Sequence, residues 1–192
     1  MSMLKTDQIA DFFSPILGLQ SLLDDIATVP LAEAMSQLEN VTSLPDGLSM
    51  PSPSSLKAMC QDAMDIASSS PARRQVPSIV DGIDGVNIIA AMIIYTMEKP
   101  FPFYAILTFP LNVKGVRKAG SLTCQLPFFK LVTIGWKFLV SVPNYRFQGI
   151  AYRTIRIDGN NVLQEKHTNF LTEFAVGKRV TFAAPTSLTT NP

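Results

Sequence analysis

Residues 149–192 read GIAYRTIRIDGNNVLQEKHTNFLTEFAVGKRVTFAAPTSLTTNP and contain the most strand-like runs of the chain. The run at 150–155 is rich in β-branched and aromatic residues, and it predicts a buried strand that carries one arginine, Arg153. A second strand is predicted at 180–182, and it leads into a hydroxyl-rich turn at 185–190. Because an arginine near hydroxyls at a strand end can hold a negatively charged group, this stretch predicts an anion site.

Helices are expected before these strands. Apolar residues at steps of three and four predict helices over residues 1–28, 31–38, 56–67, 84–97 and 103–111, and a last one from Pro127 to a stop at Pro143. Ser54 or Ser55 is the predicted N-cap of the helix at 56–67, and Asp84 is the predicted cap of the helix at 84–97. The helix at 84–97 is apolar nearly all round, which predicts a central position. Since helices come first and strands last, the order favours an α+β fold over alternating βαβ units.

Two regions are predicted along the chain. Residues 1–75 are expected to form a helical N-terminal region, and residues 76–192 a second region that ends in the strands. Two or three strands are too few for an independent sheet. Their partners are therefore expected beyond residue 192 or in another chain, or the sheet is not completed.

The composition is more apolar than that of an ordinary globular protein, with 47% hydrophobic and 16% charged residues and a mean hydropathy of +0.23. The most apolar runs, 88–94 and 131–142, both fall short of the roughly 20 residues that a membrane-spanning helix needs. The N-terminus lacks the long apolar core of a secretory signal. We therefore expect a soluble chain without a transmembrane segment and favour the cytoplasm.

The charge balance and the cysteines exclude further classes of function. A net charge of +1 and a pI near 7.7 argue against nucleic acid as a partner, which would call for concentrated basic residues. Cys60 and Cys124 lie on unrelated segments, and buried thiols are favoured over a disulfide. With one histidine and two scattered cysteines, no metal site is expected.

Several segments, in this order, resemble the arginine-type mono-ADP-ribosyltransferases. The segments are AAMIIYTME at 90–98, Phe103-Tyr104, PFFKLV at 127–132, IAYR at 150–153 and TSLT at 186–189. The first three are similar to the helical approach of that family, and the last two to its arginine strand and its Ser-Thr-Ser segment. The resemblance covers roughly residues 85–192, and the ordered set is more specific than any single motif.

The resemblance implies an ADP-ribosyltransferase-like β-sandwich and a reaction between NAD and a protein substrate that presents an arginine. Tyr152 and Arg153 would bind NAD, since a guanidinium offers a planar fork of donors to the diphosphate. Ser187 and Thr189 would shape the nicotinamide pocket. In the family, the catalytic carboxylate is the second Glu of a Glu-x-Glu motif several tens of residues later, and the first Glu orients the acceptor arginine.

This sequence departs from the family pattern. Thr154 replaces a glycine after the Tyr-Arg pair, and Leu188 replaces the middle hydroxyl. The last carboxylates, Glu165 and Glu173, precede the second predicted strand, and no Glu-x-Glu follows it. We therefore expect either an incomplete enzyme or an inactive relative that serves as an interaction or regulatory domain. An unrelated helical domain is the third hypothesis, with Arg153 as an edge or salt-bridge arginine.

Other conspicuous side chains are interpreted as structural. Tyr95 and Thr96 are expected to pack within their helix with satisfied hydroxyl groups. Trp136 lies in an apolar helix and is expected in the core rather than as a stacking platform. His167 lies in a polar segment without an obvious partner and is interpreted as solvated.

Overall fold

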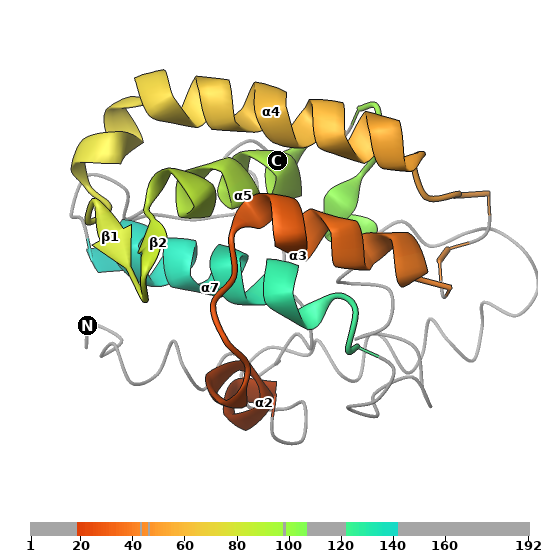
Figure 1. Ribbon diagram of the computed structural model, residues 1–192, viewed down its shortest axis with the longest axis horizontal. Coiled ribbons are helices and arrows are strands. Elements are labelled where there is room, and N and C mark those ends of the chain that lie inside the picture. Colours follow the sequence, from red (N-terminus) through yellow and green to blue (C-terminus); the bar gives the residue numbers. More distant parts are fainter. Residues whose placement is uncertain (1–18, 43, 46, 98, 107–121, 142–192) are drawn as a thin grey trace, which may run out of the picture.

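The computed structural model describes residues 19–42, 44–45, 47–97, 99–106 and 122–141. This part of the chain is mostly helical and includes one two-stranded antiparallel sheet (Figure 1). Such a composition is compatible with the predicted α+β class. The strands predicted at 150–155 and 180–182 lie outside the described residues.

Helix α3, Leu31–Gln37, passes directly into a 3₁₀ turn, η1, at Leu38–Asn40. This confirms the helix predicted at 31–38. Its predicted apolar stripe is buried throughout, and it consists of Leu31, Ala34, Met35 and Leu38. Helix α2, Leu19–Asp25, precedes it as the described part of the helical region predicted at 1–28.

Helix α4, Pro53–Ser69, is longer at both ends than the helix predicted at 56–67. Its N-cap is Ser52, whose Oγ accepts a hydrogen bond of 3.2 Å from the backbone N–H of Ser55. The prediction of Ser54 or Ser55 as the cap was wrong. Proline has a helix-compatible φ and no N–H to satisfy, so Pro53 starts the helix and Ser52 becomes the cap.

A short hairpin follows α4 and the 3₁₀ turn η2, Pro71–Arg74. Strands β1, Ile79–Val80, and β2, Ile83–Asp84, pair antiparallel. Asp81 and Gly82 connect them with φ values of 49° and 84°. Positive φ at both central residues is the backbone of the two-residue turn that Asp-Gly favours. Neither strand of this hairpin was predicted from the sequence.

Asp84 joins the hairpin to helix α5, Val86–Thr96, as the predicted cap. Its Oδ1 accepts a hydrogen bond of 2.9 Å from the backbone N–H of Val86, although the residue directly before the helix is Gly85. The same oxygen lies 3.4 Å from the Arg73 guanidinium, which also donates to the Val76 carbonyl. The acidic residue thus holds η2, β2 and α5 together.

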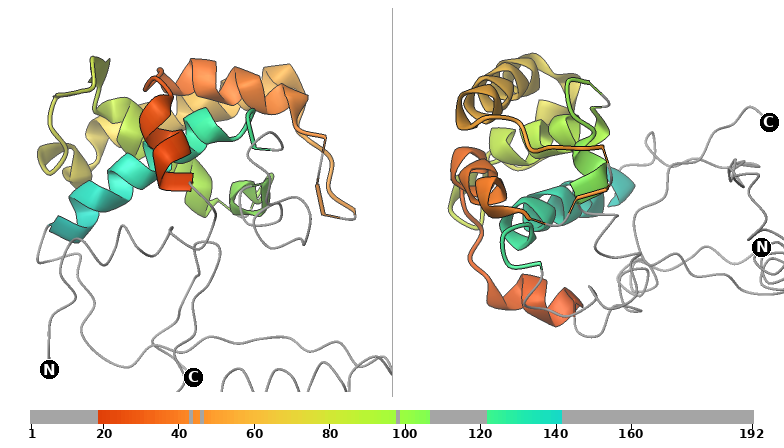
Figure 2. Two further views of the ribbon diagram at one scale, coloured as in Figure 1. Left: turned by 90° about the horizontal axis from the view of Figure 1, so that it is seen from below. Right: turned by 90° about the vertical axis from the view of Figure 1, so that its right-hand side faces the viewer.

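Helix α5 is the centre of the described fold, as its apolar sequence predicts. It lies between α4 and α7, Leu126–Ser141, as Figure 1 and the right-hand view of Figure 2 show. Asn87 in its first turn is 9% exposed. The Asn87 Oδ1 accepts from the backbone N–H of Leu31, and its Nδ2 donates to the Asp84 carbonyl, both at 2.9 Å. One side chain therefore satisfies groups at the starts of α3 and α5.

The segment that follows α5, residues 99–106, contributes aromatic side chains to the core. Phe101 and Phe103 are buried, and residues 103–106 are helical, as predicted for the start of 103–111. Phe103 packs against Phe128 of α7, the helix predicted to start at Pro127. Lys130 of α7 donates a hydrogen bond to the carbonyl of Ile26 beyond the end of α2.

One buried cluster extends from Leu23 to Val132 and includes residues on both sides of residue 75, where a region boundary is predicted. Helices α3 and α4 from the first region pack on α5 from the second. The boundary at 75 remains a prediction. None of the described helices combines the length and the apolarity needed to cross a membrane.

Candidate functional site

The four residues predicted to bind NAD, Tyr152, Arg153, Ser187 and Thr189, lie outside the described residues. The described part of the resemblance is its helical approach, which corresponds to α5, residues 103–106 and α7. A different candidate site lies on these same helices.

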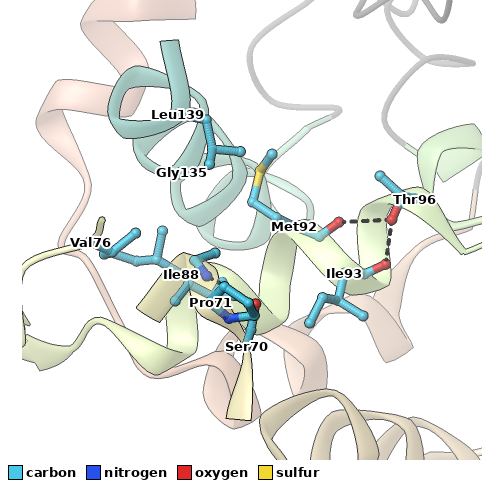
Figure 3. Close-up of a pocket in the computed structure, with 11 residues that line it drawn as sticks. Ser70, Pro71, Val76, Ile88, Met92, Ile93, Thr96, Gly135 and Leu139 are labelled. Atoms are coloured by element: carbon cyan, nitrogen blue, oxygen red, sulfur yellow. Dashed lines mark hydrogen bonds between the residues drawn. The ribbon is translucent and has the colours of Figure 1, made fainter. Parts of the chain in front are cut away.

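A groove runs along α5 and α7 beside the turn that ends α4 (Figure 3). We call it the α5–α7 groove. Its volume is about 360 Å³, which lies at the lower end of the range of ligand pockets. Its lining residues are Ser70, Pro71, Ala72, Val76, Ile88, Ile89, Met92, Ile93, Thr96, Gly135 and Leu139. Pro71 and Thr96 are exposed, and they mark where the groove opens to solvent.

The described residues that line the α5–α7 groove are apolar apart from two hydroxyl groups, and both hydroxyls are bonded to backbone. Ser70 Oγ accepts from the N–H of Ala72 at 3.2 Å. Thr96 Oγ1 donates to the carbonyls of Met92 and Ile93 at 3.2 and 2.9 Å, which confirms the satisfied hydroxyl predicted for Thr96. None of the described lining residues is charged. The described part of the lining therefore favours an apolar group over a diphosphate.

Gly135 sets the width of the α5–α7 groove, because α5 and α7 approach closely there. A Cβ atom on Gly135 would stand 2.6 Å from Met92 Cγ and 3.2 Å from Ile88 Cγ2. Glycine thus leaves room for the Met92 side chain, which extends from α5 toward α7 (Figure 3). A glycine within an apolar helical pattern is a sequence signal for such an approach. That signal was not used in predicting a site.

Tyr95 of α5 and Trp136 of α7 form another contact between these two helices. Their rings meet edge to face, with centroids 5.2 Å apart. Tyr95 is buried, and this burial, with a smaller contribution from Tyr104, raises the pKa of its phenol above the ordinary value. The hydroxyl therefore stays neutral at physiological pH. Trp136 is half-buried against the core, which agrees with its predicted packing role.

A second groove of about 480 Å³ lies between α3 and the start of α4. Glu39, Lys57 and Cys60 are among its lining residues. Burial raises the pKa of the Cys60 thiol, so the reactive thiolate is disfavoured.

Cys60 is buried and Cys124 half-buried, and both are free thiols, in agreement with the prediction. Within the described ranges, no group of three His, Cys, Asp or Glu side chains could hold a metal ion.

Thr133 of α7 has a buried hydroxyl with no hydrogen-bond partner among the described residues, and the residue is 4% exposed. We expect Thr133→Val to raise the free energy of unfolding by about 1 kcal/mol, since it removes an unpaired buried polar group at nearly constant shape. Urea unfolding followed by circular dichroism measures the change. Thr96→Val is the matched control and should not stabilise, because its hydroxyl is exposed and bonded. A destabilised Thr133→Val would contradict the prediction.

Searches against protein-family models, curated proteins and solved structures find no match to this chain.

Proposed function

We propose that this chain belongs to the NAD-dependent mono-ADP-ribosyltransferases, which transfer ADP-ribose from NAD to an arginine of a protein substrate. The ordered resemblance from residue 90 to Thr189 carries the proposal. It is supported by the helical form of its described N-terminal segments, α5 and α7.

Arg153 has the central role in the proposed NAD site. Its guanidinium would hold the diphosphate of NAD through parallel charge-assisted hydrogen bonds, which a lysine cannot reproduce. Tyr152 beside it would contact the same substrate, and the hydroxyls of Ser187 and Thr189 would keep the nicotinamide pocket in shape. None of the described lining residues of the α5–α7 groove is charged, which supports placing the site for this anionic substrate outside them.

The transfer step needs one further group. Cleavage of the nicotinamide–ribose bond passes through an oxocarbenium-like state, which a nearby carboxylate stabilises more than it stabilises the bound substrate. No Glu-x-Glu follows Thr189 within these 192 residues. We therefore assign the NAD-binding half of the site to this chain and assign its catalytic carboxylate to no residue.

Replacing Arg153 tests the proposal. We expect Arg153→Ala to weaken NAD binding at least about tenfold, a loss of about 1.4 kcal/mol, in isothermal titration calorimetry of the full chain. Arg153→Lys should remain weak, because a point charge does not replace the fork. Arg74→Ala is the matched control, since it removes an exposed arginine of the described part and should leave NAD affinity unchanged. Failure of the parent chain to bind NAD, or equal binding by Arg153→Ala, contradicts the proposal.

A non-catalytic interaction or regulatory domain of the same family is the second candidate function, and the departures at Thr154 and Leu188 favour it. A β-branched residue at 154 would crowd the backbone near NAD, and Leu188 offers no hydrogen bond. If these residues have reduced NAD binding, Thr154→Gly combined with Leu188→Ser should strengthen it. Unchanged NAD affinity in that double variant would count against this candidate.

A further inference from the structure

We propose that Ser70, between α4 and η2, is a phosphorylation site for a serine/threonine protein kinase. The kinase class is the one that selects a proline directly after the serine and a basic residue at the third position after it. The phosphate donor is ATP bound to that kinase. The inference goes beyond the proposed reaction with NAD and does not depend on it.

The sequence around Ser70 carries both recognition elements of such a kinase. The local sequence reads SSSPARRQ, with Pro71 at the first position after Ser70 and Arg73 at the third. Three Ser-Pro pairs occur in the chain, and they begin at Ser14, Ser52 and Ser70. Ser70 alone is followed by a basic residue at the third position. Because kinases use charge patterns to separate related substrates, this arginine favours Ser70 over the other two serines.

The segment that contains Ser70 is accessible to a kinase. None of residues 68–75 is buried, although Ala67 before them and Val76 after them are. Within the segment, Ser70 is half-buried and Pro71 is exposed. The 3₁₀ turn η2 contains no buried residue, so it can open locally while uncovering little of the core. The segment can therefore enter a substrate cleft as an extended chain.

Ser70 already has an extended backbone. Its φ and ψ are −68° and 138°, in the region that steric contact with a following proline ring favours. Its Oγ accepts a hydrogen bond of 3.2 Å from the backbone N–H of Ala72. The neighbouring Ser68 and Ser69 lie in α4 and donate their hydroxyl hydrogens to carbonyls of that helix. Of the three adjacent serines, Ser70 is therefore the one presented for transfer.

The transfer step is a simple displacement at phosphorus. The Ser70 Oγ attacks the γ-phosphorus of ATP, and its hydroxyl proton passes to a base of the kinase. The bond from that phosphorus to the oxygen that bridges the β- and γ-phosphates breaks, and ADP leaves with the electron pair. The new phosphate carries a charge of about −1.5 to −2 at pH 7.

The surroundings of Ser70 suit this charge. Arg73 and Arg74 lie three and four residues away, and the segment SSSPARRQ has no acidic residue. The contacts of the Arg73 guanidinium with Asp84 and with the Val76 carbonyl are both long, at 3.4 Å, so a phosphate would be a stronger partner. Ser70 also lines the α5–α7 groove (Figure 3). Phosphorylation would therefore add a charge to described lining residues that now have none.

Phosphorylation of the full chain in vitro tests the proposal. The probe is a cyclin-dependent kinase in complex with its cyclin, with ATP as donor, and peptide mass spectrometry maps the products. We expect phosphate on Ser70, and transfer at least about tenfold slower in Arg73→Gln, because the guanidinium at the third position is lost. This substitution also removes the salt bridge to Asp84, which loosens the segment, so a lower rate reports recognition and not access. No phosphate on Ser70, or an unchanged rate in Arg73→Gln, would overturn the proposal.

Ser52 provides the matched control. It also precedes a proline, has an extended backbone with φ −60° and ψ 155°, and accepts a hydrogen bond from the N–H of Ser55 at 3.2 Å. It is exposed, whereas Ser70 is half-buried, but its third position is Ser55 instead of a basic residue. We expect transfer to Ser52 at least about tenfold slower than to Ser70, and Ser55→Arg should raise it. Transfer to Ser52 as fast as to Ser70, or no gain in Ser55→Arg, would show that the arginine is not read and would contradict the proposal.

Discussion

Phe103→Ala is expected to lower the free energy of unfolding by about 3–5 kcal/mol. Phe103 is completely buried, at 0% exposed. Its ring centroid lies 5.0 Å from that of Phe101 and 6.1 Å from that of Phe128 in α7. Truncation removes a whole ring from this cluster and leaves a cavity that the neighbouring helices can only partly fill. Because a domain is stable by only about 5–15 kcal/mol, the loss is a large fraction of the total.

Tyr104→Ala provides the matched control for Phe103→Ala. It removes an aromatic ring from the next residue of the same helical turn, but Tyr104 is 41% exposed. We expect a loss below about 1 kcal/mol, as is usual for partly exposed positions. Urea unfolding of both variants, monitored by circular dichroism, measures the difference. Similar losses in the two variants would show that Phe103 is not the centre of this cluster.

Asn87→Ala is expected to lower the free energy of unfolding by about 2–3 kcal/mol. The substitution removes two hydrogen bonds and leaves the Leu31 N–H at the start of α3 without its partner. An unpaired buried donor costs about 1–3 kcal/mol in addition to the lost net bonding. Helix α3 has no side-chain cap of its own, so nothing nearby replaces the Asn87 amide.

Asn40→Ala is the control for Asn87→Ala. Asn40 is exposed, and its amide makes one long hydrogen bond of 3.5 Å to the Gln37 carbonyl. We expect a change of less than about 0.5 kcal/mol. Hydrogen exchange adds a local measurement, since Asn87→Ala should speed exchange of the Leu31 amide, while Asn40→Ala should not. A Leu31 amide that exchanges equally slowly in Asn87→Ala would contradict the capping role.

The helices were predictable because each carries its own periodic signal. The stripe of α3 is buried as predicted, and α5, apolar nearly all round, lies at the centre. Pro127 lies in the first turn of α7, as a proline with a fixed φ and no N–H should. In these segments, local preference and tertiary packing agree.

The hairpin, the role of Asn87 and the α5–α7 groove could not be predicted from local sequence patterns, because they depend on contacts between distant residues or on very short strands. Strands β1 and β2 have two residues each, which is too short for a recognisable alternation. The role of Asn87 depends on Leu31, 56 residues earlier. The α5–α7 groove arises from the placement of α5, α7 and the turn after α4, although Gly135 offered a hint. The candidate NAD residues Tyr152, Arg153, Ser187 and Thr189 remain predictions from the resemblance.

The bond from Lys130 to the Ile26 carbonyl has a consequence for how the chain folds as it is made. These residues are 104 positions apart, and α7 is the helix on which α2 packs. At a synthesis rate of about 5–20 residues per second, roughly 5–20 s pass between the appearance of Ile26 and that of Lys130. During this interval the apolar side of α2 cannot form its packing against α7, so this part of the core is completed only after α7 has been synthesised.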